Sequence, residues 1–275
     1  MTSRAAGRAA AYTAVVGLAI VFFLPFLWMF STAVKPDAEI FTYPPRWIPS
    51  VWKLGNFTAA WTKAPFSRFF LNSVLVTAAI TTLQLVTGSL AAYAFARLRF
   101  PGKSLLFLAY LSIMMLPSQV TLIPNFVTLR RLGLLNTYWA LILPFTATGF
   151  GTFLIRQHFL SIPQDLFDAA TVDGAGHLRM LWAIALPLAR PALATFGLLT
   201  TMWHWNDFFW PLLVTSSIEM RTMPLGLVVF THSEQGTSWN LLMAAGILTA
   251  LPIVVLFLVA QRYFVQGIAR VGIKG

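Results

Sequence analysis

Long apolar runs alternate with short polar segments along the whole chain. The runs reach the length of about 20 residues that an α-helix needs to cross a hydrocarbon core about 30 Å thick. The pattern therefore predicts an all-α integral membrane protein, and we expect one transmembrane domain over residues 1–275. Its predicted spans are residues 12–33, 69–96, 105–126, 137–155, 192–214 and 241–263.

The first apolar run has a second interpretation as a cleaved signal peptide, because Ser31–Ala33 has the small-x-small pattern of a cleavage site. Apolar regions of signal peptides usually have only about 7–15 residues, so the length of the run favours a retained helix. The polar segment 34–67 follows, with Trp47, Trp52 and Trp61. Indole rings suit a membrane boundary, and docking of a partner protein is the alternative role for them.

Composition excludes several classes of protein. With 58% hydrophobic and 10% charged residues, the chain is too apolar for a soluble domain of its length. The absence of Cys excludes disulfides and thiolate chemistry. The net charge of +11 comes from basic residues scattered through short loops, which indicates contact with anionic lipid head groups rather than nucleic acid.

No pattern in the chain predicts catalysis, a metal site or a nucleotide site. Gly102–Ser104 matches only the end of a phosphate-binding loop, because Arg97 stands where the first Gly of that loop is required. The histidines show no H-E-x-x-H spacing or comparable ligand pattern. They are His158, His177, His204 and His232.

The amphipathic stretch 161–192 separates the fourth and fifth predicted spans. Ser161 followed by Gln164 has the spacing of a helix N-terminal capping box, and Pro163 is tolerated in a first turn. We therefore expect a short helix that ends near Val172.

A turn and a second helix follow this short helix. Asp173–Gly174 predicts the turn, because Gly adopts positive φ without steric cost and Asp can bond to its own backbone. The second helix is expected from about Gly176 to Ala185, ending before Pro187, since proline disfavours the helical conformation for the residue that precedes it. The product would be a helix, a turn and a helix outside the bilayer.

Three motifs of this sequence resemble a known family. The first, Asp168–Ala170 with Gly174 and Ile184–Pro187, is similar to the EAA motif of permease subunits in binding-protein-dependent ABC importers. Asp168 stands where the family most often has Glu. The second, Trp205–Leu212, is similar to a pattern of the sugar-uptake, maltose-transporter-like branch. The third, Gln261–Gly267 with Gly272–Gly275, looks like the closing consensus of that branch.

The resemblance implies a type I ABC importer permease fold with six transmembrane helices and a cytoplasmic coupling helix in the loop of residues 156–191. That helix would dock on a separate ATPase, which would bind ATP and Mg, so this chain would hold no cofactor. The implied docking residues are Asp168, Ala169, Ala170, Asp173, Gly174, Ile184, Leu186 and Pro187.

The resemblance also implies partners and a location. The partners would be ABC ATPase subunits acting as a dimer, a second homologous permease chain, an extracytoplasmic substrate-binding protein and membrane lipid. The chain would lie in a bacterial inner membrane with both termini in the cytoplasm. The solute would be a sugar or a related small molecule.

Polar residues within the spans are candidates for lining a translocation pathway, although hydrogen bonding between helices also recruits such residues. On a continuous helix Asp207 would share a face with Trp203 and Trp210. The candidates are Asn72, Gln84, Gln119, Asn206 and Asp207. An ion-gradient-driven secondary transporter or channel is the alternative function, but it predicts internal repeats and buried carboxylates, and apart from Asp207 the acids lie in predicted loops.

Overall fold

The computed structural model describes residues 2–231 and 236–272, with the side chains of residues 7–8, 10–231 and 236–261. Within these ranges every element of regular structure is a helix. The chain divides by its internal contacts into two compact units. Unit 1 comprises Met1–Phe66 and Gly226–Leu251, and unit 2 comprises Ser67–Leu225 and Pro252–Gly275. The assignment of the whole chain to one transmembrane domain stays a prediction.

Three described helices are individually long and apolar enough to cross a membrane. They are Ala10–Ala33 within α1 (Thr2–Ala33), α3 (Phe66–Arg97), and Trp239–Gln261 within α14 (Trp239–Gly272). The C-terminal motif lies partly in α14, but its side chains after Gln261 and residues 273–275 lie outside the described part of the chain.

Three further spans would each need two helices joined at a bend, so the number of six spans also stays a prediction. Prolines or short non-helical segments at the bends explain why one apolar run becomes two helices. The bent pairs are α4 (Lys103–Ser112) and η2 (Ile113–Met115) with α5 (Ser118–Arg131) at 95°, α6 (Tyr138–Ile142) and η3 (Leu143–Phe145) with α7 (Gly149–Ser161) at 46°, and His177–Leu188 with α11 (Arg190–Trp205) at 79°.

Unit 1 fixes the end of α1 in a small core. Ala33 and Val34 are fully buried. The side-chain amide of Asn56, on α2 (Gly55–Lys63), donates to the carbonyls of Ala33 at 2.8 Å and Lys35 at 3.0 Å. The segment that resembles a cleavage site is thus part of the packed structure, and the retained first helix stays a prediction. The other short element here is η6 (Leu227–Phe230).

The loop after α1 is held by its own polar groups. Lys35 is fully buried, its ammonium donates to the carbonyl of Arg46, and burial lowers the pKa of Lys35. On η1 (Asp37–Glu39), hydrogen bonds from the hydroxyl and backbone N–H of Ser50 lower the pKa of Glu39. The ring of Trp47 remains about half exposed, as a role at a membrane boundary or a docking surface requires.

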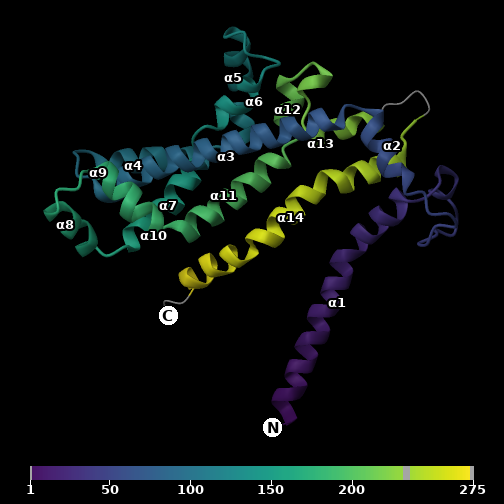
Figure 1. The fold of residues 1–275 in the computed structure, drawn as a ribbon, viewed down its shortest axis with the longest axis horizontal. Coiled ribbons are helices and arrows are strands. Elements are labelled where there is room, and N and C mark those ends of the chain that lie inside the picture. The colour runs from purple at the N-terminus through teal and green to yellow at the C-terminus, as the bar shows by residue number, and fades with distance from the viewer. Residues whose placement is uncertain (1, 232–235, 273–275) are drawn as a thin grey trace. The chain divides into compact units, whose positions relative to one another are not determined.

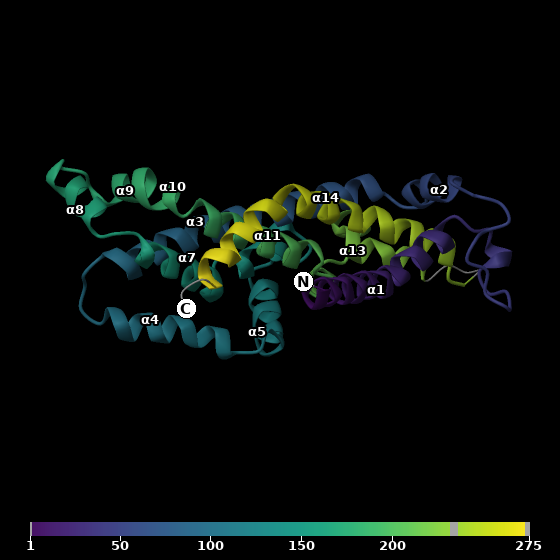
Figure 2. The same cartoon turned by 90° about the horizontal axis from the view of Figure 1, so that it is seen from below.

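In unit 2, α7 packs against α11 and α4. The elements α8 (Asp165–Val172), α9 (His177–Met180) and α10 (Leu186–Leu188) lie together at one end of the unit (Figures 1 and 2). Toward the end of the unit's sequence, α12 (Phe209–Val214) packs against α5 and α6. The remaining short elements are η5 (Ile218–Met220) and α13 (Met223–Gly226).

The crossing of α7 and α11 depends on a glycine. A Cβ atom added to Gly151 of α7 would lie 2.3 Å from Cζ of Phe196 on α11. Contacts between carbon atoms are favourable at about 3.5–4.0 Å, so no side chain fits at this position without movement of the ring or the helices. Phe196 is itself buried. The two helices that flank the loop of residues 162–189 are therefore in close contact.

Two cations pack against the C-terminal end of α3. The ammonium of Lys103 donates to the carbonyls of Ala96 at 3.3 Å and Leu98 at 2.9 Å. Arg156 of α7 donates through Nε to the Phe95 carbonyl at 3.1 Å and lies 4.1 Å from the ring centre of Phe107. These positions suit cations, because the last carbonyls of a helix have no partner within it.

The predicted capping box is wrong. Ser161 is the last residue of α7, and its hydroxyl donates back to the carbonyl of His158 at 2.7 Å. Ile162 is extended because it precedes Pro163. Gln164, the residue before α8, makes no side-chain capping bond. Pro163 thus lies between the end of α7 and the start of α8, whereas the sequence pattern predicted that a helix begins at Ser161.

The predicted end of the second helix before Pro187 is also wrong. The helix continues from α9 through a π-helix, Leu181–Ala185, into α10, which contains Pro187. A proline ring clashes with the carbonyl four residues earlier in a regular α-helix, and the wider π-helical turn gives the ring room. The helix instead ends at Leu188, and Ala189 separates it from α11.

The fifth predicted span is interrupted at the position of Asp207. Helix α11 ends at Trp205, and α12 begins at Phe209. The carboxylate of Asp207 accepts a hydrogen bond from the backbone N–H of Trp210 at 3.2 Å, as residues before a helix often do. The prediction that Trp203, Asp207 and Trp210 share a face of one continuous helix is therefore wrong.

Candidate functional site

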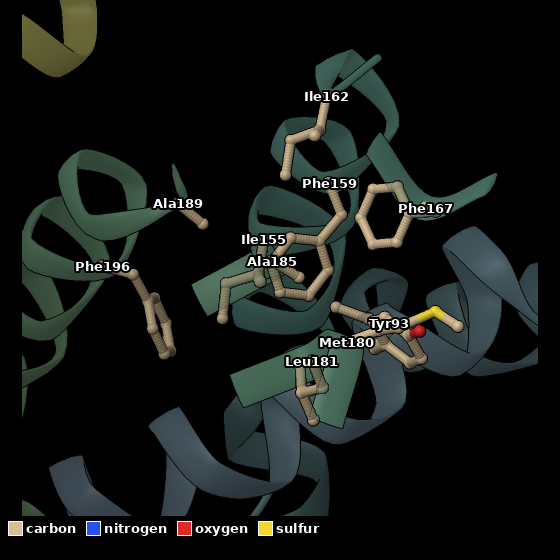
Figure 3. Close-up of a cluster of buried hydrophobic side chains, with 11 residues drawn as sticks. Tyr93, Ile155, Phe159, Ile162, Phe167, Met180, Leu181, Ala185, Ala189 and Phe196 are labelled. Carbon is tan, nitrogen blue, oxygen red and sulfur yellow. The ribbon is translucent and has the colours of Figure 1, made fainter. Parts of the chain in front are cut away.

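The helix–turn–helix of α8 to α10 has a buried inner face (Figure 3). Phe167 of α8 and Met180 of α9 lie in one cluster with Tyr93 of α3 and Phe159 of α7. Phe167 is 3% exposed, and its ring centre lies 6.5 Å from that of Tyr93. Burial of a large apolar side chain contributes about 1.5–3 kcal/mol. The segment is therefore anchored to the helices of unit 2. The cluster also contains Ala92, Ile155, Ile162, Leu181, Ala185, Ala189 and Phe196.

The turn after α8 is a Schellman motif. The backbone N–H of Ala175 donates to Ala170 at 2.9 Å, and that of Gly174 donates to Thr171 at 3.0 Å. Gly174 has φ of 74°, which glycine adopts at no steric cost. A Cβ atom there would meet no other atom within 4 Å, so the turn faces open space.

The predicted docking residues lie mainly on the outer side of this segment. Asp168, Ala169, Asp173 and Gly174 are exposed. The remaining ones, Ala170, Ile184, Leu186 and Pro187, are half-buried. All of them except Pro187 pack against the cluster from outside. A notch of about 160 Å³ opens between the two helices. It is lined by Ala170, Asp173, Ala175, Arg179, Met180, Ala183 and Ile184.

Sequence reasoning missed three apolar residues on the same outer side. Leu166 is 46% exposed, Val172 is 88% exposed and Leu178 is 67% exposed. A soluble partner would bury such side chains. The eight residues of α8 include too few turns for the 3.6-residue period to distinguish Leu166, which faces outward, from Phe167, which faces inward.

Arg97 is a second omission, since the sequence analysis considered it only as a mismatch to a phosphate-binding loop. This last residue of α3 donates to the carbonyls of Phe159 and Ile162, the latter at 2.6 Å, and to Oε1 of Gln164 at 2.6 Å. Its guanidinium carbon lies 4.0 Å from the ring centre of Phe167. No sequence motif indicates this contact, because residue 97 is 62 or more residues away from its partners.

Two of the predicted pathway residues, Gln119 and Asp207, line one cavity of about 300 Å³. Asn125, which the sequence analysis did not select, lies about two turns after Ser118 on α5 and also lines it. The other lining residues are Ser118, Thr121, Leu122, Phe145, Trp203, Phe209 and Trp210. Asn206 does not line this cavity. It lines an adjoining open depression that shares Trp203 and Asp207 with the cavity, and its amide donates to the Met202 carbonyl at 2.8 Å.

The other two pathway candidates are tied to protein groups. The amide of Asn72 donates to the carbonyls of Glu219 at 2.7 Å and Arg221 at 2.8 Å, and accepts from the Tyr138 hydroxyl at 2.6 Å. The amide of Gln84 donates to the Phe145 carbonyl at 2.8 Å and accepts from the Thr200 hydroxyl. Both side chains are buried and connect separate elements.

Within the described side chains, no group of three or more His, Cys, Asp or Glu residues is arranged to hold a metal ion. The site thus offers an anchored surface and a cavity between helices. On an all-helical fold with helices long enough to cross a membrane, these features are the ones expected of a subunit of a membrane transport system.

The particular family follows from comparison with known proteins. Residues 84–270 match the family described as binding-protein-dependent transport system inner membrane component, and the chain belongs to this family, the permease subunits of ABC importers. The matched range contains the EAA-like motif, so the resemblance seen in the sequence is confirmed at the level of the family. The chain is accordingly a transport subunit.

Full-length relatives agree with this assignment. The chain is 40% identical over 254 residues to the probable ABC transporter permease protein YurM of Bacillus subtilis, covering 91% of this chain and 83% of the relative. It is 36% identical over 261 residues to the sn-glycerol-3-phosphate transport system permease protein UgpE of Yersinia pestis, covering 92% of each.

The fold is also that of a solved importer. A crystal structure of a bacterial ABC transporter involved in the import of the acidic polysaccharide alginate contains a chain that matches with a TM-score of 0.85 at 23% identity. The match covers 96% of this chain and 98% of that chain. The predicted all-α, type I importer fold is confirmed.

Proposed function

We propose that this chain forms half of the translocation pathway for a sugar or a related small solute and couples to a separate ATPase through α8 to α10. The observation that carries the proposal is the outer surface of α8 and α9. Leu166, Val172 and Leu178 are exposed there, while Phe167 anchors the same helix inside. An apolar surface on a rigid support is the arrangement expected for docking a partner.

The docking set consists of Asp168, Ala169, Ala170, Asp173, Gly174, Ile184, Leu186 and Pro187. In this proposal α8 enters a cleft of an ABC ATPase that acts as a dimer and binds ATP and Mg. A second homologous permease supplies the other half of the pathway, and an extracytoplasmic binding protein delivers the solute. The chain lies in a bacterial inner membrane, in contact with lipid, with both termini in the cytoplasm. The family assignment supports these partners.

The solute passes beside the cavity that Gln119 and Asp207 line. Asn72, Gln84 and Asn206 stay candidates for the rest of the pathway. Amide and carboxylate groups can bond to sugar hydroxyls, and aromatic rings such as that of Trp203 can pack on sugar rings. The relative named as an sn-glycerol-3-phosphate transport system permease protein supports this substrate class.

The docking role is tested with Gly174→Asp in the intact complex. We expect normal insertion into the membrane, loss of the copurifying ATPase and no uptake. Gly102→Asp is the matched control, because Gly102 has the same φ of 74° and also faces open space. Asp tolerates this conformation better than most residues, so backbone strain is alike in both variants. Normal uptake by Gly174→Asp, or equal loss in both variants, would count against docking at α8.

The pathway is tested with single cysteines, which the absence of native Cys makes possible. We expect a charged thiol reagent to label Gln119→Cys, and ATP turnover with solute to change the rate of labelling. Ile123→Cys is the control, since Ile123 is exposed on the same helix but does not line the cavity. Equal labelling at both positions, unaffected by turnover, would refute the assignment of Gln119 to the pathway.

A further inference from the structure

Arg97 joins three segments of unit 2 through one guanidinium group. It ends α3, it donates to two carbonyls at the C-terminal end of α7, and it donates to Gln164 just before α8. Terminal helix carbonyls carry partial negative charge and lack partners within the helix. The planar fork of arginine holds several such acceptors in a fixed geometry, whereas an ammonium on a flexible stem fixes no such geometry.

The contacts of Arg97 continue to the acidic residue of the motif. Nε2 of Gln164 donates to Oδ1 of Asp168 at 2.9 Å, so a chain of hydrogen bonds runs from α3 through Gln164 to Asp168. The guanidinium also stacks on Phe167, on the inner side of the same helix. Cation–π contacts of this kind contribute about 0.5–2 kcal/mol. Both the position of α8 and the direction of its outer carboxylate therefore depend on Arg97.

We propose that Arg97 is a positioning residue that sets the angle of α8 against α3 and orients Asp168 for the ATPase. The inference rests on the proposed docking of α8. When the ATPase moves α8, the guanidinium carries the displacement directly to α3, one of the helices long enough to span the membrane. Without the guanidinium, Phe167 still holds α8 in the apolar cluster, but α8 can tilt. Part of the movement of the ATPase is then not transmitted to α3.

Two other arginines provide matched controls. Arg99 is exposed two residues further along, so Arg99→Gln removes the same charge from the same region. Arg156 makes the same kinds of contact, with a backbone carbonyl and an aromatic ring, but with α3 and α4 and not with α8. Arg156→Gln therefore perturbs helix packing near Arg97 and leaves α8 itself unaffected.

The experiment measures solute transported per ATP hydrolysed by the complete importer in proteoliposomes. We expect Arg97→Gln to lower this ratio by roughly 2- to 30-fold, the range usual for couplings carried by packed networks. Arg97→Lys should fall between Arg97→Gln and the unmodified chain. Arg99→Gln and Arg156→Gln should keep the ratio unchanged even if they reduce the yield of complex, because a purely structural defect lowers transport and hydrolysis together.

A second variant tests the inference in case Arg97→Gln does not fold. Gln164 is exposed, so Gln164→Met interrupts the chain to Asp168 without disturbing a buried group, and it should also lower the ratio. An unchanged ratio in Arg97→Gln, or in Gln164→Met where Arg97→Gln does not fold, would overturn the inference. An equal fall in Arg156→Gln would do the same. Retention of the ATPase by Gly174→Asp would instead refute the docking proposal on which the inference rests.

Discussion

Substitution of Gly151 by Ala should destabilise the protein, although alanine is the better helix former. In the interior of a helix, alanine is favoured over glycine by about 1 kcal/mol. Against this gain, the new Cβ would lie within 2.8 Å of three ring atoms of Phe196, and 2.3 Å from the nearest. Reaching a normal contact of about 3.5 Å requires a shift of about 1.2 Å, and overpacking of this kind typically costs about 1–3 kcal/mol. The cost should exceed the gain.

The matched control is Gly197→Ala on α11. A Cβ there would meet its nearest neighbour, Cδ1 of Leu85, at an ordinary distance of 3.6 Å. This variant should be as stable as the unmodified chain or more so, since only the helix-propensity term of about 1 kcal/mol remains. The two variants thus make the same chemical change on two helices that pack together, and their expected changes in stability have opposite signs.

Thermal unfolding of the purified complex measures the difference. One kcal/mol corresponds to about 2–4 °C for a protein of this size, so Gly151→Ala should melt a few degrees below Gly197→Ala. Adding Phe196→Leu should remove most of the penalty of Gly151→Ala, with a coupling energy of about 0.5–3 kcal/mol. Equal melting temperatures for the two glycine variants, or no coupling with Phe196→Leu, would refute the close crossing of α7 and α11.

Two further predictions concern polar contacts. Asn72→Leu leaves two carbonyls and the Tyr138 hydroxyl without their partner, so it should lower stability by about 1–3 kcal/mol in thermal unfolding, and more than Tyr138→Phe does; equal losses would contradict this. Glu39 has a pKa below its ordinary value of 4.5, so its contact with Ser50 stabilises the loop above that pH and is lost as pH falls through the lowered value. Carboxyl-carbon NMR should show the pKa of Glu39 rising toward 4.5 in Ser50→Ala, and an unchanged pKa would exclude the contact.

Local sequence signals predicted the turn between α8 and α9 well. Gly174 has the positive φ that Asp173–Gly174 indicated, because a turn is decided by a few neighbouring residues. Helix ends near prolines were harder to predict. Pro163 separates two helices, whereas Pro187 is accommodated by a π-helix, and nothing in the local pattern distinguishes these outcomes.

Contacts between distant residues were not predictable from one sequence. Arg97 and Gln164 are 67 residues apart, and only the packing of α3 beside α7 brings them together. The interruption at Asp207 was missed for a related reason. Its carboxylate accepts a hydrogen bond from the first turn of α12, at a position where periodicity alone predicted one continuous helix.

Three cations at the end of α3, Lys103, Arg97 and Arg156, donate to backbone carbonyls, and the two arginines also lie over aromatic rings. Dissolved ions at 0.1 M largely screen interactions between exposed charges that are more than about 10 Å apart, and higher salt shortens this distance, but partly buried contacts are screened much less. Concentrated salt should therefore release a partner held by surface charge while these cations keep their contacts. Washes in concentrated salt can therefore remove such partners from the purified chain without loosening the helices that these cations join.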